Sequence, residues 1–218
     1  MKSIYLLSFI LVLASAKLAI DFSNLSIPPP TFYDCLVNQN ATRVVYEISD
    51  EQGNINENFI PNYIRAKDAG IKEVDAFVRL NDSLKAEDLL FHVNTALPAS
   101  FDGTVWLDVQ YKSKLWSLKP AQRKAYVENV ARIAQGYNFN IGISSAAESW
   151  AIVMGGLRVG SDFLSSSFPV WYANNNGEDD FLDFPSIGFG TWKTPDMKRY
   201  RLNAYICNYY IVGLSFYP

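Results

Sequence analysis

The chain alternates between two hydrophobic patterns over most of its length, and this alternation limits its possible folds more than any other feature. Short runs rich in β-branched and aromatic residues predict strands, and apolar residues at three- and four-residue steps between them predict helices. The expected strands cover residues 18–23, 43–48, 71–78, 104–110 and 140–145, and the expected helices begin near residues 31, 59, 84, 120 and 146. Repeated strand–helix units favour a parallel sheet covered by helices.

The pattern changes after the fifth unit. Residues 168–173, 187–192 and 206–216 have strand character, but the segments between them lack helical periodicity. Five strand–helix units followed by three strands predict an α/β fold, a TIM-like (β/α)5(β)3 barrel in a single domain. A doubly wound open sheet is the alternative architecture.

The first 16 residues have the pattern of a secretory signal peptide. Lys2 precedes an apolar run over residues 4–13, and Ala14-Ser15-Ala16 is a small-x-small cleavage site. The run is too short to span a bilayer, and no other run is long enough to do so. We therefore expect residues 17–218 to form one barrel domain that is secreted or delivered to a lysosome-like vesicle, as a monomer.

The net charge limits the kinds of partner, and short motifs are consistent with export. The formal net charge of −3 at pH 7 provides no cationic surface for a phosphate backbone, so nucleic acid is not an expected partner. Three acceptor patterns for N-glycosylation, which begin at Asn24, Asn40 and Asn81, fit an exported protein.

The two cysteines, Cys35 and Cys207, lie near opposite ends of residues 17–218. A pair of this kind usually forms a disulfide in an oxidising compartment. Closing so long a loop restricts the unfolded chain by about 5 kcal/mol in the loop-entropy model. The bond requires the first helix to lie beside the last strand, an adjacency that a closed barrel provides. Two unpaired buried thiols are the alternative.

The sequence lacks residues that several common kinds of catalytic or binding site require. The one histidine, His92, falls in an expected helix, which excludes a His-based zinc site and leaves a Ser–His–acid triad dependent on that residue. Residues 155–160 are glycine-rich but lack the Lys-Ser/Thr of a phosphate-binding loop. We expect neither a metal nor a cofactor.

Carboxylates and aromatic rings remain as candidate functional groups. The carboxylates expected at strand ends are Asp21, Glu47, Asp75 and Asp108, and the candidate sugar-binding rings are Tyr111, Trp150, Trp171, Tyr172 and Trp192. Acid groups that cleave glycosidic bonds and flat rings that stack on sugars are typical of a glycosidase cleft. The alternatives are that Asp108 marks a strand end meeting solvent, and that most of these rings belong to the core, because aromatic residues make up 15% of the chain.

The order of these motifs resembles that of glycoside hydrolase family 25, the muramidases also called Chalaropsis-type lysozymes. The similar segments are residues 19–23 (opening strand), 105–110 (Asp-x-Glu strand), 142–145 with Trp150 (fifth strand), 169–173 (sixth strand), 189–192 (a Trp-rich seventh strand), and 34–36 and 206–207, which resemble the nematode-type lysozyme branch. The resemblance covers essentially all of residues 17–218 and implies a (β/α)5(β)3 barrel.

The chain departs from that family at the residue that matters most for hydrolysis. The family's Glu in Asp-x-Glu is the general acid, and its position matches Gln110, whose amide has no proton to give near neutral pH. Losing a positioned general acid typically costs about 10²–10⁴-fold in rate. Asp21 and Asp108 match carboxylates that orient the sugar's acetamide group or stabilise charge, and a further family carboxylate falls on Val212.

The resemblance therefore implies a secreted lysozyme-family protein of innate defence. It would bind bacterial cell-wall peptidoglycan or a related N-acetylhexosamine glycan, with hydrolysis lost or much reduced. An active muramidase that uses Asp108 or Glu47 as the acid is the first alternative. A non-catalytic scaffold or signalling protein that kept the barrel without a sugar site is the second.

Overall fold

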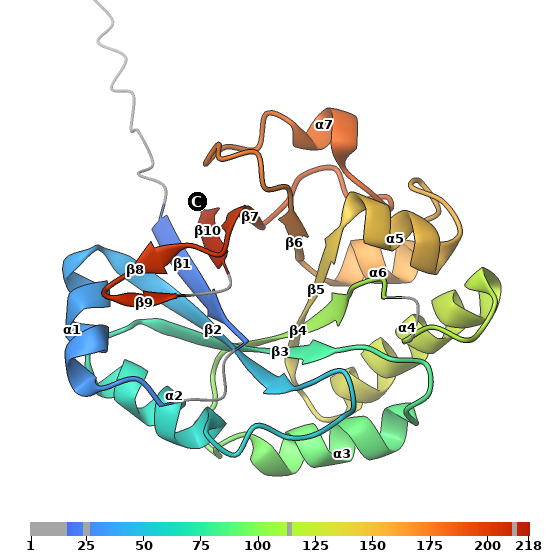
Figure 1. Cartoon of the computed structure of the whole chain (residues 1–218). Coiled ribbons are helices and arrows are strands. Elements are labelled where there is room, and N and C mark those ends of the chain that lie inside the picture. Colours follow the sequence, from blue (N-terminus) through green and yellow to red (C-terminus); the bar gives the residue numbers. More distant parts are fainter. Residues whose placement is uncertain (1–16, 24–26, 113–114, 211–212) are drawn as a thin grey trace, which may run out of the picture.

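A closed barrel forms the centre of the computed structural model, which describes residues 17–23, 27–112, 115–210 and 213–218 (Figure 1). In order around the barrel, its strands are β1 (Lys17–Phe22), β10 (Gly213–Tyr217), β7 (Met197–Leu202), β6 (Val170–Ala173), β5 (Asn140–Ala146), β4 (Thr104–Val109), β3 (Glu73–Arg79) and β2 (Ala41–Ser49). All neighbours pair in parallel except β10, which is antiparallel to both β1 and β7. The predicted barrel is confirmed, and the open sheet is excluded.

Helices cover the outside of the barrel. They are α1 (Pro30–Asn38), α2 (Phe59–Asp68), α3 (Ala86–Ala96), α4 (Pro120–Gly136), α5 (Ala147–Met154), α6 (Asp162–Ser167) and α7 (Phe184–Ile187). Proline occupies the first position of α1 and α4, where its missing N–H costs no helical hydrogen bond. Within the described residues, no helix is both long and apolar enough to span a membrane.

The buried face of α4 differs slightly from the expected one. The three- and four-residue steps of the sequence predict a face made of Tyr126, Val130, Ile133, Ala134 and Tyr137. The fully buried residues are Val127, Val130, Ala131 and Ala134. The three larger side chains, Tyr126, Ile133 and Tyr137, are half-buried at its edges and pack against the core from there. Small residues on the central line let α4 approach the barrel closely.

Two of the last three expected strands differ in the structure. The expected strand at residues 187–192 is wrong: α7 ends at Ile187, and the following residues are irregular, with Phe189 stacked on Trp150. The seventh barrel strand is instead β7, whose sequence Met-Lys-Arg-Tyr-Arg-Leu has no apolar alternation. The expected strand at 206–216 is divided between a small hairpin, β8 (Tyr205–Ile206) with β9 (Tyr209–Tyr210), and β10.

The barrel interior is filled by an aromatic layer that lies below its mouth. This layer consists of Ala19, Val45, Phe77, Trp106, Trp171, Met197 and Tyr217, a cluster separate from the larger core between strands and helices. Trp106 and Trp171 contact each other edge to face, with ring centroids 5.8 Å apart. Trp106 fits because Gly142 faces it on β5, where a Cβ atom would lie 2.3 Å from the indole ring.

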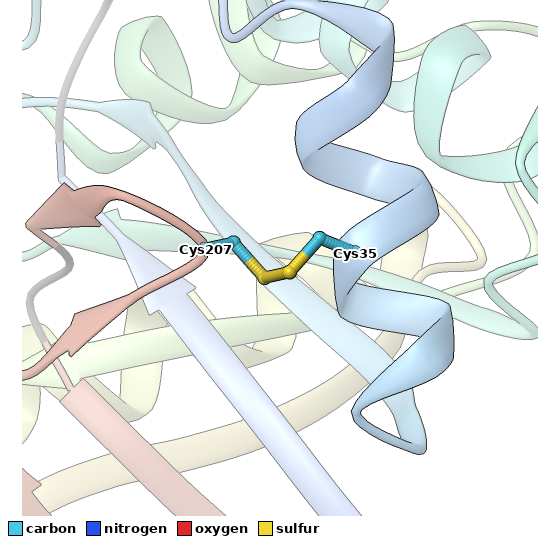
Figure 2. Close-up of a disulfide and its surroundings, with 2 residues drawn as sticks. All are labelled: Cys35 and Cys207. Atoms are coloured by element: carbon cyan, nitrogen blue, oxygen red, sulfur yellow. A yellow bond between two sulfur atoms is a disulfide. The ribbon is translucent and has the colours of Figure 1, made fainter.

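A disulfide joins the two distant parts of the chain as expected. Cys35 of α1 bonds to Cys207, and their Cα atoms are 5.8 Å apart (Figure 2). Cys207 lies in the turn of the β8–β9 hairpin rather than in the last strand (Figure 2). Cys207 and Asn208 both have left-handed backbone conformations, with φ of 53° and 63°, as a two-residue type I′ turn requires. The bond therefore fixes this hairpin to the first helix.

The disulfide should contribute substantially to stability. Replacing both cysteines with alanine is expected to lower the free energy of unfolding by up to about 5 kcal/mol, because the unfolded chain is released from a closed loop that spans most of its length. Urea unfolding of the wild type and the double variant, both without reductant, measures the difference. Coincident unfolding midpoints would contradict it.

Candidate functional site: the mouth of the barrel

Polar side chains line the mouth at the carboxyl ends of the parallel strands. They are Asp21 of β1, Glu47 of β2, Arg79 of β3, Asp108 of β4, Ser144 of β5 and Arg199 of β7. Several sit two residues beyond the aromatic layer, so strand alternation turns them to the same inner side. Asp21, Glu47 and Asp108 are only 0%, 5% and 3% exposed. The mouth thus gathers three buried carboxylates and two arginines.

Arg79 connects two of the three carboxylates. Its Nε donates to Glu47 Oε1 at 2.6 Å, and its Nη1 donates to Asp108 Oδ2 at 3.3 Å. Strand register explains the second contact, because Arg79 pairs with Asp108 across β3 and β4. One guanidinium therefore partly neutralises two carboxylates that would otherwise repel each other in a buried site.

Asp108 is also the acceptor for two neutral donors. Ser144 Oγ donates to its Oδ1 at 2.9 Å, and Gln110 Nε2 donates to the same oxygen at 3.2 Å. Ser149 Oγ in turn donates to Gln110 Oε1 at 3.3 Å, which suits the orientation of the amide. Residues two positions apart in a strand point to the same face, so the sequence predicts that Asp108 and Gln110 share one side of the chain. The structure brings them together on that side.

Asp21 has its own arginine partner. Arg199 Nε donates to Asp21 Oδ1 at 3.1 Å, and Arg199 Nη2 lies 2.9 Å from Asp21 Oδ2. The guanidinium also lies over the indole of Trp171, 4.4 Å from the ring centroid, in a cation–π contact. Gly213 leaves room for this pair, because a Cβ atom there would be 2.5 Å from Asp21 Oδ1 and 2.7 Å from Arg199 Cδ.

Burial dominates the electrostatics of the mouth. Desolvation raises the pKa of Asp21 above its usual value, although Arg199 opposes the change. Desolvation likewise raises the pKa of Glu47, while Arg79 opposes it and the Asp108 charge adds to it. The arginines hold these groups closer to ordinary acids than their burial alone would allow.

Most of the aromatic residues expected to bind sugar lie elsewhere. Trp150, Tyr172 and Trp192 are at most 8% exposed and belong to the core between strands and helices, and Trp171 is buried inside the barrel under Arg199. This placement does not support a stacking role for these four rings. Tyr111, which follows Gln110, is 36% exposed, and its role in stacking stays a prediction.

Asp75 was expected at the same end as the other carboxylates, and this expectation is wrong. It lies near the start of β3, at the opposite end of the barrel, where it accepts hydrogen bonds from Thr104 N at 2.9 Å and Trp106 Nε1 at 2.8 Å. Its role is to hold the β4 backbone and the central indole. Val212, the expected position of another family carboxylate, lies outside the described residues.

Sequence reasoning missed the two arginines. Arg79 ends strand β3 directly after the apolar run Ala76-Phe77-Val78, and a charge in that position is a signal that could have identified it. Arg199 carried no such signal, because β7 was not recognised as a strand. Among the described residues, no group of three or more histidine, cysteine, aspartate and glutamate side chains is placed to hold a metal ion.

An eight-stranded barrel with one antiparallel strand and carboxylates at its mouth has the fold of muramidase-type glycoside hydrolases. The solved muramidase from Trichobolus zukalii has this fold, with a TM-score of 0.73 and 15% identity over 93% of this chain and 94% of that one. The family model described as lysozyme-like protein 1 matches residues 13–200. The chain belongs to this lysozyme-like family, within the lysozymes of glycoside hydrolase family 25.

Curated relatives agree with this assignment. The chain is 29% identical to probable GH family 25 lysozyme 4 of Dictyostelium discoideum, over 85% of this chain and 84% of that protein. It is 25% identical to lysozyme-like protein 5 of Caenorhabditis elegans, over 90% of this chain and 89% of that protein. The predicted family, including its similarity to a nematode lysozyme-like protein, is confirmed.

The bridging arginine should be required for stability. Arg79→Gln leaves Glu47 and Asp108 buried without their cation, and breaking such a pair typically costs about 3–5 kcal/mol. The change also removes the charge that opposes the raised pKa of Glu47. A buried acid with a raised pKa binds protons more readily in the folded than in the unfolded state. The Arg79→Gln variant, in which the pKa of Glu47 rises further, therefore loses stability as pH rises.

The difference in the free energy of unfolding between wild type and Arg79→Gln should therefore grow between about pH 4 and pH 8. Urea unfolding at several pH values measures it. Lys124→Gln is the control, because Lys124 is 3.9 Å from Glu128 in a more exposed pair on α4, which should contribute only about 0.3–0.5 kcal/mol. A pH-independent deficit, or one no larger than that of the control, would contradict the bridging role.

Proposed function

We propose that this chain is a secreted lysozyme-family protein of innate defence that binds peptidoglycan or a related N-acetylhexosamine glycan, with hydrolysis lost or much reduced. The observation that carries the proposal is the amide of Gln110 hydrogen-bonded to Asp108, where the family's general acid is expected. The amide keeps a donor beside Asp108 permanently, but it cannot transfer a proton to a departing sugar oxygen. The proposed site would thus bind a sugar and lack the step that cleaves it.

Asp108 is poorly suited to replace the missing acid. Its Oδ2 accepts from Arg79, and its Oδ1 accepts from Ser144 and Gln110. Three donors are therefore directed at its two oxygens, so each oxygen already accepts a hydrogen bond inside the mouth. Both oxygens of Asp21 likewise face the guanidinium of Arg199.

Restoring the acid tests the proposal directly. In Gln110→Glu, two carboxyl groups share one site, so the pKa of one of them rises and a proton becomes available for transfer. We expect little or no release of reducing ends from peptidoglycan by the wild type, and a gain of at least about 10²-fold in the variant.

The matched control is Gln135→Glu, the same chemical change at an exposed position on α4. It should leave activity at the wild-type level. Rapid hydrolysis by the wild type would contradict the proposed loss of function. If Gln110→Glu folds normally and shows no gain, the amide alone does not account for the loss.

An active muramidase with Glu47 as the acid is the second candidate. Two observations favour it: burial raises the pKa of Glu47, and the residue is linked through Arg79 to Asp108. If this candidate is correct, wild-type protein hydrolyses peptidoglycan, Glu47→Gln abolishes that hydrolysis, and Gln110→Asn leaves it nearly unchanged.

Glycan binding separates both candidates from a scaffold without a sugar site. Wild-type protein should co-sediment with insoluble peptidoglycan, and Tyr111→Ala should weaken this binding by about 5–10-fold, because Tyr111 is the exposed ring beside Gln110. Phe91→Ala, which removes a 55% exposed ring from α3 on the outside of the barrel, is the control and should bind normally. Failure of the wild type to co-sediment would favour the scaffold.

A further inference from the structure

The structure separates two N-glycosylation patterns that look equivalent in the sequence. Both begin with an asparagine in the described residues, at Asn40 and at Asn81, and each is followed by the required hydroxyl residue two positions later. The third pattern, at Asn24, lies outside the described residues. The difference between the first two lies in their burial and in the partners of their side chains.

Asn40 lies on the surface, in the turn between α1 and β2. The residue is exposed, and its backbone N–H donates to Val37 O at 3.0 Å, which closes the turn. Its φ of 59° is left-handed, a conformation that asparagine adopts more readily than most residues. The turn therefore fixes the backbone while the side chain extends from the surface, and a large group attached there displaces no core residue.

Asn81 is buried and its amide is already used. It is 6% exposed, its Nδ2 donates to Glu51 O at 2.7 Å, and its Oδ1 accepts from Ser83 N at 2.8 Å. The first bond joins the loop after β3 to the loop after β2, and the second closes a turn within the loop after β3. A sugar on Nδ2 would occupy the space of Glu51 O and break this connection, so the folded chain has no room for a glycan at Asn81.

We propose that Asn40 is an N-glycosylation site of the exported protein and that Asn81 is a structural asparagine that carries no glycan. In the transfer, Asn40 Nδ2 forms a bond to C1 of the first N-acetylglucosamine of a lipid-diphosphate-linked oligosaccharide. The bond from C1 to the diphosphate oxygen breaks, the lipid diphosphate leaves, and Nδ2 loses one proton to a base. Transfer can precede folding, so any chain modified at Asn81 would fail to reach this structure and would be missing from the folded, exported population.

The position of Asn40 is compatible with the proposed glycan-binding mouth. Asn40 directly precedes β2, whereas Glu47 of the mouth lies near the other end of the same strand. The attached oligosaccharide would thus project from the amino ends of the parallel strands, away from the arginine–carboxylate pairs. The inference rests on the secretory route of the proposed function and on no property of the mouth.

The test uses the full chain exported from a eukaryotic cell line, with residues 1–16 replaced by a general secretion leader. The secreted, folded protein is treated with peptide N-glycosidase in ¹⁸O-water, which converts each glycosylated asparagine into a labelled aspartate. Peptide mass spectrometry then reads the positions 40 and 81 separately, whatever the state of position 24. Because the leader is supplied, a failure of the natural export signal or of glycan binding does not affect this result.

We expect the label at position 40 and none at position 81. Aspartate tolerates the left-handed backbone, so Asn40→Asp should be secreted at the wild-type yield. Glycosidase treatment should change the gel mobility of this variant by one glycan less than that of the wild type. Asn81→Asp is the same change at the buried position. The protein of this variant that is secreted should show the same change in gel mobility on glycosidase treatment as the wild type. A labelled position 81 in folded protein, or an unmodified position 40, would overturn the proposal.

Discussion

The arginine–carboxylate pairs at the mouth are the constraint on which the rest of the site depends. Asp21, Glu47 and Asp108 are all buried, and an unpaired buried carboxylate costs several kcal/mol. Arg199 holds Asp21, and Arg79 holds Glu47 and Asp108 together. Three negative groups can therefore remain beside one another above an aromatic layer. The same pairing opposes the rise in pKa that burial causes at Asp21 and Glu47.

Gln110 fits this network as a neutral donor. A glutamate in its place would add a fourth carboxyl group to a mouth that has two guanidinium groups, so its proton would have to remain bound at neutral pH. The amide has nearly the same shape, donates to Asp108 and requires no proton. Glutamine at this position therefore avoids that electrostatic repulsion. This is a physical reason why an amide is compatible with the buried charges of the mouth.

The sequence predicted the parts of the fold that have clear hydrophobic periods. Strands β1 to β6 and helices α1 to α5 follow apolar patterns, and Asp108 and Gln110 were correctly expected to point the same way. Strand β7 could not be recognised, because its buried positions include Lys198 and Arg199, whose charges are satisfied by partners distant in the sequence. Four of the five aromatic candidates are buried, because the sequence does not distinguish a core ring from one that stacks on a sugar, whereas the role of Tyr111 stays a prediction.

The layer beneath the mouth explains why the geometry of the site depends on residues that do not line it. Phe77, Trp106 and Trp171 fill the barrel, and Trp171 also supports the guanidinium of Arg199. Gly142 and Gly213 are needed because a side chain at either position would collide with Trp106 or with the Asp21–Arg199 pair. The charged layer is therefore positioned by packing, and its own ion pairs then fix the orientation of each carboxylate. Changing one residue at the top of such a stack can alter its chemistry without disturbing the layers that hold it.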